Sequence, residues 1–234
     1  MNPKVSIIMG IYNCEKTLRE SIDSILEQTF QDWEFIMCDD GSTDDTYNIA
    51  NEYVNRYPNK FILIKNDKNS GLAYSLNHCL EYAKGIYIAR QDGDDLSNKD
   101  RLRQQVEFLD SNKVFSLVST AIGLFDDKNI WDGFMPKEYP QAIDVINCRA
   151  FVHAAAMIRK EALEKINGYR VSKETLRNED FDLWCRIYST GFKGANILER
   201  LYLVREDANA YIKFIYSISI FLSFISISIF SYQV

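Results

Sequence analysis

Short apolar runs alternate with amphipathic segments along the first 95 residues of the chain. Residues 5–9 form a nearly continuous apolar run without a helical period, which is typical of a strand buried on both faces. Residues 15–27 follow, with apolar side chains along one stripe of a helix. The same alternation predicts strands at 33–38, 61–64 and 86–89, a second helix ending near residue 57, and a third helix at 72–83.

This repeated order of strand, polar turn and helix predicts an α/β domain. Such alternation is typical of a parallel sheet with helices on both faces, and ligands bind such open sheets at the carboxyl ends of the strands. Because each strand ends in a polar or glycine-containing turn, we expect the turns to gather on one edge and form a binding site. The turns are residues 10–13, 39–42, 69–71 and 92–95.

The second half of the chain has a less regular pattern. Residues 126–129 are expected to form a hairpin turn, and residues 131–150 an irregular loop that shapes a pocket. We find no internal repeat and no interdomain linker, so the chain is predicted to form a single domain over residues 1–210. The pattern predicts helices at 101–109, 160–166 and 181–188, and strands at 117–119, 122–125, 154–158, 195–198 and 201–204.

Composition and charge narrow the class of protein. The 234 residues are 47% hydrophobic, which is enough for a sizeable core and excludes global disorder. The net charge of −6 argues against a nucleic-acid partner. The five cysteines are scattered without a CxxC pair, which predicts neither a zinc site nor a disulfide framework. Buried thiols and an amino terminus that leads directly into a strand predict a cytoplasmic protein.

Three carboxylates fall within four residues at Asp92, Asp94 and Asp95. Their repulsion is relieved if a divalent cation lies among the oxygens, and carboxylates are hard ligands that suit Mg²⁺ or Mn²⁺. An acidic surface turn is the simpler interpretation, but the converging strand ends favour a metal site. Since the sequence lacks both the GxxxxGK[ST] and the GxGxxG phosphate motifs, a metal is expected to carry the phosphates of a ligand.

Five motifs give the chain a resemblance to the family 2 glycosyltransferases of the GT-A fold. The resemblance covers roughly residues 3–208, and the motifs occur in the family's order. Within the family, the chain resembles bacterial enzymes that build capsule, exopolysaccharide or lipopolysaccharide. It implies a Rossmann-like, mostly parallel sheet and an inverting, metal-assisted sugar transfer from a nucleotide sugar, most often UDP-linked, to a glycan or lipid-linked glycan. The motifs lie at residues 5–13, 38–44, 69–73, 92–95 and 178–184.

The resemblance also implies how the domain is divided and where the nucleotide binds. Residues 1–96 correspond to a nucleotide-binding half and residues 97–210 to an acceptor-binding half. Tyr12 is expected to stack near the base. The other positions implied for base recognition are the backbone at Gly10, which lines the same pocket, Asp40, which accepts a hydrogen bond from the base, and Asp39 beside it.

The remaining donor-site roles fall on the turns after the third and fourth strands. The loop around Asn69 and Gly71 is implied to lie along the nucleotide sugar. Asp92 and Asp94 correspond to the family's DxD motif, with Asp94 contacting Mn²⁺ or Mg²⁺ and Asp92 contacting the ribose or a water on the ion. Asp95 is expected to hold a water or a sugar hydroxyl.

The resemblance implies that Asp180 is the general base, with Glu179 as the alternative. Inverting transfer is a single displacement in which a carboxylate takes the proton of the acceptor hydroxyl. The position of Asp180 just before a helix helps to keep it ionised through the helix dipole. The structural interpretation of both acidic residues is a cap at the start of that helix.

Three further residues have a functional and a structural interpretation. His153 either lines the donor or acceptor pocket or is a satisfied, half-buried histidine. Trp184 belongs either to the core or to an acceptor platform. Arg205 either reaches the diphosphate or forms a surface ion pair with Glu206 or Asp207. The sequence lacks the QxxRW motif of processive synthases, which favours the addition of single sugars.

The carboxyl-terminal segment has an unusual composition. Residues 211–234 form a hydrophobic tail with no charged residue from position 214 onward, which is long enough to span a bilayer. Alternating isoleucine and serine also fit a strand. The tail predicts either an anchor at the inner face of the cell membrane or a truncated or frameshifted end.

Two other functions compete with the glycosyltransferase prediction. A sugar-1-phosphate nucleotidylyltransferase would share a similar sheet and acidic metal site, but it usually has a glycine-rich basic loop after the first strand, where this chain has GIYNC. A non-catalytic nucleotide- or carbohydrate-binding remnant would not need the intact Asp92, Asp94 and Asp180.

Overall fold

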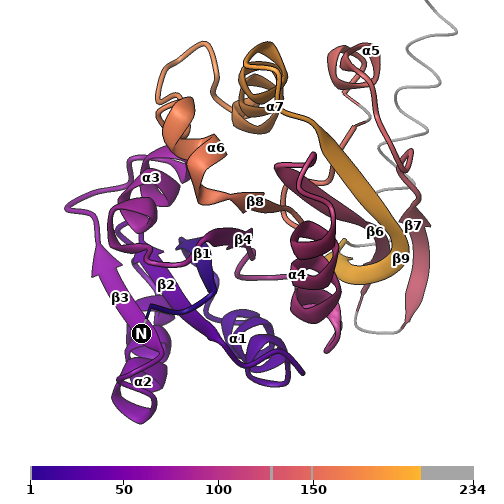
Figure 1. Cartoon of the computed structure of the whole chain (residues 1–234). Helices are drawn as coiled ribbons and strands as arrows, with labels where there is room; N and C mark the ends of the chain where they lie inside the picture. The colour runs from indigo at the N-terminus through magenta and orange to yellow at the C-terminus, as the bar shows by residue number, and fades with distance from the viewer. Residues whose placement is uncertain (1, 127–128, 149, 207–234) are drawn as a thin grey trace, which may run out of the picture.

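A mixed β-sheet forms the centre of the protein in the computed structural model, which describes residues 2–126, 129–148 and 150–206 (Figure 1). The strands are β1 (Val5–Ile11), β2 (Trp33–Asp39), β3 (Phe61–Lys65), β4 (Tyr87–Arg90), β5 (Leu96–Ser97), β6 (Leu117–Phe125), β7 (Ile130–Phe134), β8 (Met157–Arg159) and β9 (Gly194–Arg205). The helices are α1 (Leu18–Leu26), α2 (Thr46–Arg56), α3 (Leu72–Tyr82), α4 (Arg101–Ser111), α5 (Ala142–Ile146), α6 (Lys160–Lys165) and α7 (Glu179–Ser189). The strand order is β3-β2-β1-β4-β8-β6-β9-β5, with β7 paired to β6.

The first four strands pair in parallel, as the sequence predicts. Alternate side chains of β1 enter two separate cores because both faces of the sheet are covered. Ile7 packs in a core with α1, α2 and α4, whereas Ile8 packs in a second core with α3, α6 and α7. Figure 1 shows α3 and α1 on opposite sides of β1. Burial on both faces explains why these strands are continuous apolar runs.

The second half of the sheet mixes strand directions. β8 lies between β4 and β6 and is antiparallel to both, whereas β9 is parallel to β6. The predicted strands 117–119 and 122–125 are one strand, β6, and the predicted strands 195–198 and 201–204 are one strand, β9. The ladder between them shifts register around Ala121. This irregularity interrupts the apolar pattern without ending either strand.

The region predicted as an irregular loop contains two regular elements. Within residues 131–150, strand β7 pairs with β6, and α5 begins with a capping box between Gln141 and Asp144. The side chains of β7 are intermediate or exposed, which explains the missing apolar pattern. Helix α1 begins at Leu18, later than the predicted residue 15.

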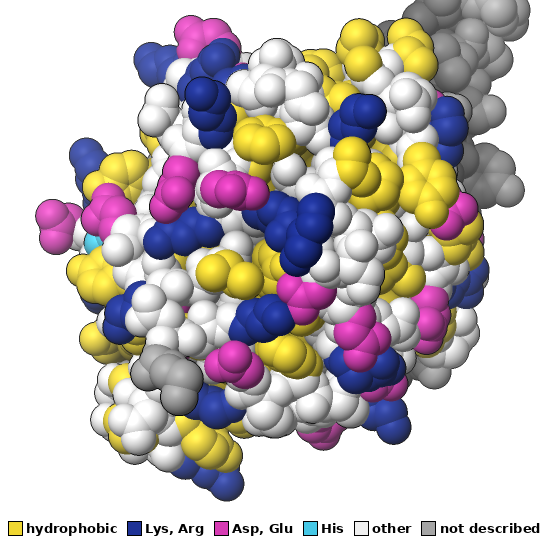
Figure 2. All heavy atoms as spheres, viewed as in Figure 1, with side chains coloured by type: hydrophobic (Ala, Val, Ile, Leu, Met, Phe, Trp, Pro, Cys, Tyr) yellow, Lys and Arg dark blue, Asp and Glu magenta, His cyan; other side chains and the backbone are white. Residues whose placement is uncertain are grey.

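The surface carries charges of both signs. On the face seen in Figure 2, Lys and Arg side chains are interspersed with Asp and Glu. The predicted hydrophobic tail, residues 211–234, lies outside the described residues. Among the helices of the described part of the chain, none combines the length and the apolar character needed to cross a membrane.

Candidate active site

The turns that follow β1 to β4 meet at one edge of the sheet, because the four strands are parallel. The Asn13 backbone nitrogen donates to Ser42 Oγ at 3.1 Å, and Asn13 Oδ1 accepts from the Thr43 backbone nitrogen at 2.8 Å. A Cβ on Gly93 would lie 2.9 Å from Cys14 Sγ, so the acidic turn also approaches the turn after β1 closely. The predicted convergence therefore exists in the fold.

Asp40 is fully engaged by the protein. Only 4% of the residue is exposed. Its Oδ1 accepts from the Ser70 backbone nitrogen at 2.9 Å and from Asn66 Nδ2 at 2.7 Å, and its Oδ2 accepts from the Gly71 backbone nitrogen at 2.8 Å. These bonds hold the loop that leads into α3. They leave little capacity for the base contact that the sequence predicts for Asp40.

Asp39 differs from its neighbour in having an unsatisfied oxygen. The residue is completely buried, and its Oδ1 accepts from the Ser42 backbone nitrogen at 3.3 Å. Oδ2 has no hydrogen-bond donor in the described part of the chain, and Lys65 Nζ lies 3.8 Å away. A buried acceptor without a donor lowers the stability of the fold, unless a ligand supplies the missing hydrogen bond. Tyr12, which is 47% exposed, lies on the turn after the adjacent strand β1.

Gly10, Asn69 and Gly71 shape the same edge. A Cβ on Gly10 would approach Leu72 Cδ1 at 3.1 Å and Ser75 Cβ at 3.3 Å, so glycine allows α3 to pack closely on β1. Gly71 has a φ of +90° at the start of α3, a conformation that favours glycine. Asn69 is exposed in the preceding loop. Gly10 therefore has a packing role at the edge that the nucleotide is predicted to occupy.

Buried polar side chains hold the acidic turn from beneath. Gln91 Nε2 donates to the carbonyl oxygens of Asp92 and Asp95, at 3.3 and 3.0 Å. The Asp92 backbone nitrogen donates to the Tyr202 hydroxyl at 3.0 Å, and Arg90 Nη2 donates to Asp92 Oδ1 at 2.5 Å. The backbone of the turn is thus held by Gln91, just after β4, and by Tyr202 of β9, whereas Arg90 of β4 holds the Asp92 side chain.

The carboxyl groups of Asp94 and Asp95 have different surroundings. Asp94 is an exposed residue, but partial desolvation of its carboxyl and repulsion by Asp92 raise its pKa above the usual value. Asp95 is 4% exposed, and its Oδ1 accepts from the Arg205 backbone nitrogen at 2.9 Å. Burial raises the pKa of Asp95 to about 8. Asp95 therefore joins the turn to β9. A water or a sugar hydroxyl, as the sequence predicts for Asp95, would have to bind a carboxyl that already accepts a hydrogen bond from Arg205.

Arg205 also contacts the acidic turn through its side chain. Its Nε donates to the Asp94 carbonyl oxygen at 3.1 Å, and its guanidinium forms an ion pair with Glu20 at 2.5 Å. The sequence predicts that Arg205 either reaches the diphosphate or pairs with Glu206 or Asp207 at the surface. The structure provides Glu20 of α1 as an ion-pair partner, and Asp207 lies outside the described residues. The guanidinium also lies 4.5 Å from the centre of the Phe125 ring.

The acidic turn fits a metal ion that binds together with a phosphorylated ligand. In the described part of the chain, no group of three or more His, Cys, Asp or Glu side chains is arranged to hold a metal alone. Mg²⁺ is commonly bound by one or two carboxylates and by the phosphates of a substrate. Asp94 is exposed and the Asp92 side chain is 29% exposed, so both are accessible for this kind of coordination.

Asp180 lies in the first turn of α7 and lines a pocket of about 250 Å³. Its Oδ1 accepts from the Phe181 backbone nitrogen at 2.7 Å. The N-cap position belongs to Asn178, which makes no side-chain capping bond, so neither acidic residue is the N-cap. Trp184 also lines this pocket, whereas Glu179 does not. Of the two predicted bases, Asp180 has the better access to a ligand.

His153 and Trp184 pack against each other beneath this pocket. Their ring centroids are 5.8 Å apart, and Trp184 also packs edge-to-face against Phe151. His153 Nε2 lies 2.9 Å from the Tyr169 hydroxyl, and burial together with the nearby Arg90 charge lowers the pKa of His153 well below its usual value. Trp184 is 4% exposed, so it belongs to the core and also lines the pocket.

Tyr169 is a site residue that the sequence pattern does not identify. Its backbone nitrogen and oxygen are both bound to the side chain of Asn77, each at 2.8 Å. Burial raises the pKa of its hydroxyl, and the charges of Asp92 and Asp180 add to the effect. Its hydroxyl lies 2.9 Å from Nε2 of His153, whose ring packs against Trp184 of the pocket. Tyr169 follows Gly168 in the connection between α6 and α7, residues 166–178, where no periodic pattern distinguishes it.

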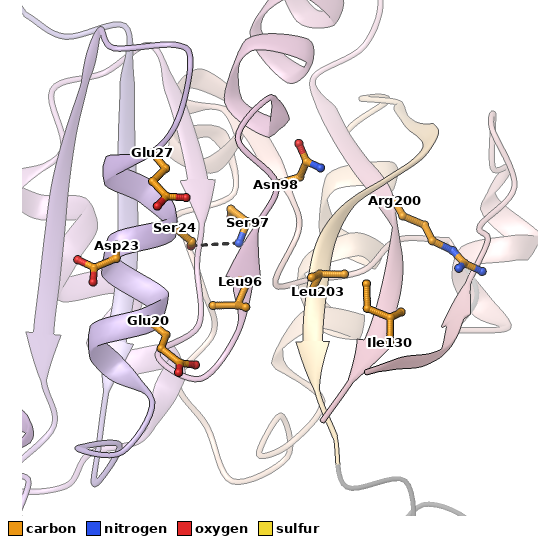
Figure 3. A pocket seen from close by; sticks show the side chains of 10 residues that line it. All are labelled: Glu20, Asp23, Ser24, Glu27, Leu96, Ser97, Asn98, Ile130, Arg200 and Leu203. Carbon is orange, nitrogen blue, oxygen red and sulfur yellow. Dashed lines mark hydrogen bonds between the residues drawn. The ribbon is translucent and has the colours of Figure 1, made fainter. Parts of the chain in front are cut away.

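A larger pocket of about 540 Å³ lies between α1 and β9 (Figure 3). Figure 3 shows acidic side chains of α1 on one side and Arg200 on the other, with Leu203 between them. None of the residues predicted to form the site lines this pocket, so pocket size does not locate the candidate active site. The lining residues are Glu20, Asp23, Ser24, Glu27, Leu96, Ser97, Asn98, Ile130, Arg200 and Leu203.

Comparisons with known proteins point to one family. The sequence model described as "Glycosyl transferase family 2" matches residues 6–167. The chain is 47% identical over 218 residues to "Putative glycosyltransferase EpsE" of Bacillus subtilis (strain 168), which covers 92% of this chain and 78% of that protein. It is 31% identical over 219 residues to "UDP-Glc:alpha-D-GlcNAc-diphosphoundecaprenol beta-1,3-glucosyltransferase WfaP" of Escherichia coli, covering 90% and 81% of the two chains.

Two solved structures have a similar fold. The crystal structure of S. aureus TarS 1-349 in complex with UDP matches with a TM-score of 0.72 and 20% identity, over 90% of this chain and 62% of that chain. The mannosyltransferase PcManGT from Pyrobaculum calidifontis, in complex with GDP-Man and Mn²⁺, matches with a TM-score of 0.69 and 20% identity, over 87% and 57%. This chain thus spans about three-fifths of the structures that it resembles, and at this identity the likeness concerns the fold.

Proposed function

Because the chain belongs to the family 2 glycosyltransferases, we propose that it transfers a sugar from a UDP-linked donor to a hydroxyl group of a surface polysaccharide. The observation that carries this proposal is the gathering of Asp39 and the acidic turn at one edge of the sheet. Asp180, in a pocket at the start of α7, adds a candidate base. The UDP complex of TarS supports the nucleotide, and the name of WfaP supports an acceptor that is a lipid-linked glycan.

The nucleotide base is proposed to bind Asp39 rather than Asp40. The buried Asp39 Oδ2 needs a hydrogen-bond donor, whereas three protein donors already occupy Asp40. Tyr12 is exposed beside β2 and offers a ring on which the base stacks. This assignment reverses the roles that the sequence predicts for the two aspartates.

The diphosphate is proposed to bind at the acidic turn with Mn²⁺ or Mg²⁺. Asp94 would hold the ion directly, while Asp92 would contact the ribose or support the ion from the side. When bound, the ion neutralises negative charge on the leaving diphosphate. Support comes from the accessible carboxylates of the turn and from the Mn²⁺ in the complex of PcManGT.

The chemical step is proposed to be a single displacement that inverts the anomeric carbon. Asp180 takes the proton of the acceptor hydroxyl as the new carbon–oxygen bond forms. The bond between the anomeric carbon and the diphosphate oxygen breaks, and the nucleoside diphosphate leaves. Asp180 lines a pocket with Trp184 and Phe151, and these aromatic walls would hold the acceptor.

The division of the domain follows from these assignments. Residues 1–96 would supply the nucleotide site, and residues 97–210 would supply Asp180, Trp184 and the acceptor pocket. Activity at the cytoplasmic face of the membrane would suit a lipid-linked acceptor. Membrane association through residues 211–234 stays a prediction, because these residues lie outside the described part of the chain.

A panel of nucleotide sugars tests the proposed reaction. We expect UDP-sugars with Mn²⁺ to raise the thermal midpoint, since ligand binding stabilises the folded state, and the matching sugar to give UDP release with an acceptor extract. Pyrophosphate release from UTP and a sugar 1-phosphate would instead indicate a nucleotidylyltransferase. Binding without turnover of any donor would indicate a non-catalytic module.

Paired substitutions separate the roles of Asp39 and Asp40. Asp39→Asn should raise the KM for the donor about 10- to 100-fold with little change in the thermal midpoint, because it places an N–H group against the base. Asp40→Asn should lower the free energy of unfolding by about 1–3 kcal/mol, because an N–H group would face a backbone donor. Denaturant unfolding and donor kinetics on both variants give the comparison. A stable Asp40→Asn enzyme with a greatly raised donor KM would restore the assignment predicted from sequence.

A further inference from the structure

Arg90 is a buried cation directly beneath the acidic turn. It is 2% exposed, and its Nη2 lies 2.5 Å from Asp92 Oδ1. Its Nε and Nη1 are buried and have no hydrogen-bond partner in the described part of the chain. A buried charge with unpaired N–H groups lowers stability relative to an apolar side chain. The fold thus retains Arg90 at a cost.

The backbone of the turn does not depend on this guanidinium. Gln91 binds two carbonyl oxygens of the turn, and the Tyr202 hydroxyl binds the Asp92 backbone nitrogen. The Arg90 backbone is itself held, since its nitrogen donates to the Ala156 carbonyl oxygen at 2.9 Å. What the Arg90 side chain adds is its contact with the Asp92 carboxylate.

Arg101 strengthens the positive potential under the turn. It is completely buried, its Nη1 donates to the Arg90 carbonyl oxygen at 2.8 Å, and its guanidinium lies 5.2 Å from the centre of the Tyr202 ring. Within the part of the chain that the structure describes, Arg101 forms no ion pair with a carboxylate. Of these two arginines, only Arg90 therefore pairs directly with the turn. The arrangement places two cations beneath the acidic turn, close enough to interact with Asp92 and Asp95.

We propose that Arg90 is a positioning residue that fixes Asp92 through Oδ1, presents Oδ2 to the donor and leaves Asp94 to bind the metal ion. The proposal rests on the proposed function, because it divides the donor site between these two aspartates. A charge-assisted hydrogen bond is short and directional, so it restricts rotation of the Asp92 side chain before the ligand arrives. Without it, Asp92 would rotate freely beside Asp94 and compete for the ion.

The test compares Arg90→Met and Arg90→Lys with a control ion pair on the surface. Arg19→Met removes an exposed two-point pair with Glu52, in which neither side chain contacts the turn in the described part of the chain. We expect Arg90→Met to unfold within about 3 °C of the wild type or above it. An apolar side chain replaces a buried guanidinium with two unsatisfied nitrogens, and the Asp92 side chain, which is 29% exposed, can be solvated by water. Its affinity for UDP with Mn²⁺, measured by calorimetry, should fall about 10- to 100-fold, with donor KM raised more than kcat is lowered. Arg90→Lys should recover part of this loss, and Arg19→Met should show none.

The Asp92→Asn background decides between positioning and a general structural role. If Arg90 acts through Asp92, Arg90→Met should add little to the loss of UDP affinity that Asp92→Asn already causes. Additive losses, or a lower thermal midpoint with unchanged UDP affinity, would overturn the proposal. The double variant also answers the question if Arg90→Met alone does not fold, because it removes both partners. If Asp92→Asn itself leaves the affinity for UDP unchanged, the donor role proposed for Asp92 is wrong. If Asp92→Asn lowers the affinity and Arg90→Met does not, only the inference about Arg90 is refuted.

Discussion

Asp180→Asn should lower kcat by about 10²- to 10⁴-fold, the range that a positioned general base contributes. Asparagine has nearly the same shape, so the hydrogen bond from the Phe181 backbone nitrogen to the side-chain oxygen can persist. It cannot take a proton from the acceptor hydroxyl. Initial rates of UDP release at saturating donor measure the loss, and donor KM should change little because Asp180 lies in the pocket of α7.

Glu179→Gln is the matched control for this substitution. Glu179 is also in the first turn of α7, but it does not line the pocket. We expect it to retain most of the wild-type rate. If Glu179→Gln loses the activity and Asp180→Asn retains it, the base is Glu179 and the assignment from pocket geometry is wrong.

Asp94→Asn should lower the rate of sugar transfer by about 10²- to 10³-fold, comparable to the loss of one electrostatic group that stabilises a transition state. The amide oxygen is a weaker ligand than a carboxylate for Mn²⁺. The dependence of the rate on Mn²⁺ concentration should therefore move to higher concentrations. In calorimetry, the gain in UDP affinity on adding Mn²⁺ should largely disappear.

Asp67→Asn controls for the removal of a negative charge near this edge. Asp67 is exposed and follows β3, so it shares the edge without belonging to the acidic turn. Its substitution should leave both the rate and the Mn²⁺ dependence unchanged. An Asp94→Asn enzyme with wild-type turnover would refute the metal role of Asp94.

The fold of residues 1–96 could be predicted from the sequence because its strands and helices pack against elements that are near in the chain. Each of β1, β2 and β3 is followed by its own covering helix, so apolar runs and helical stripes alternate in chain order. The predicted family and the GT-A fold are both confirmed by the comparisons. The second half was predicted less well because its pairings are distant in sequence. Strand β8 pairs with β4 and with β6 through only a few residues on each side. No local sequence pattern indicates that β8 lies between these two strands.

The sequence predicts where the candidate site lies better than it predicts the hydrogen bonds within the site. Residue type and parallel order place Asp39, Asp40 and the acidic turn at one edge, as the sequence indicates. The sequence does not specify which donor reaches which oxygen, because Asp40 is bound by a loop 30 residues away and Asp95 by a backbone nitrogen 110 residues away. Those partners determine why Asp39, and not Asp40, has an oxygen available.

The contacts between the acidic turn and β9 have a consequence for the order of folding. The Asp92 backbone reaches Tyr202, and Asp95 reaches Arg205, each across 110 residues. Contacts of such sequence separation carry a large loop-closure entropy and form late. During synthesis the strands β1 to β4 can pair before β9 has emerged, but the acidic turn is then still without its partners on β9. The enzyme should therefore form the parallel strands β1 to β4 first and complete its proposed donor site last, when β9 joins the sheet.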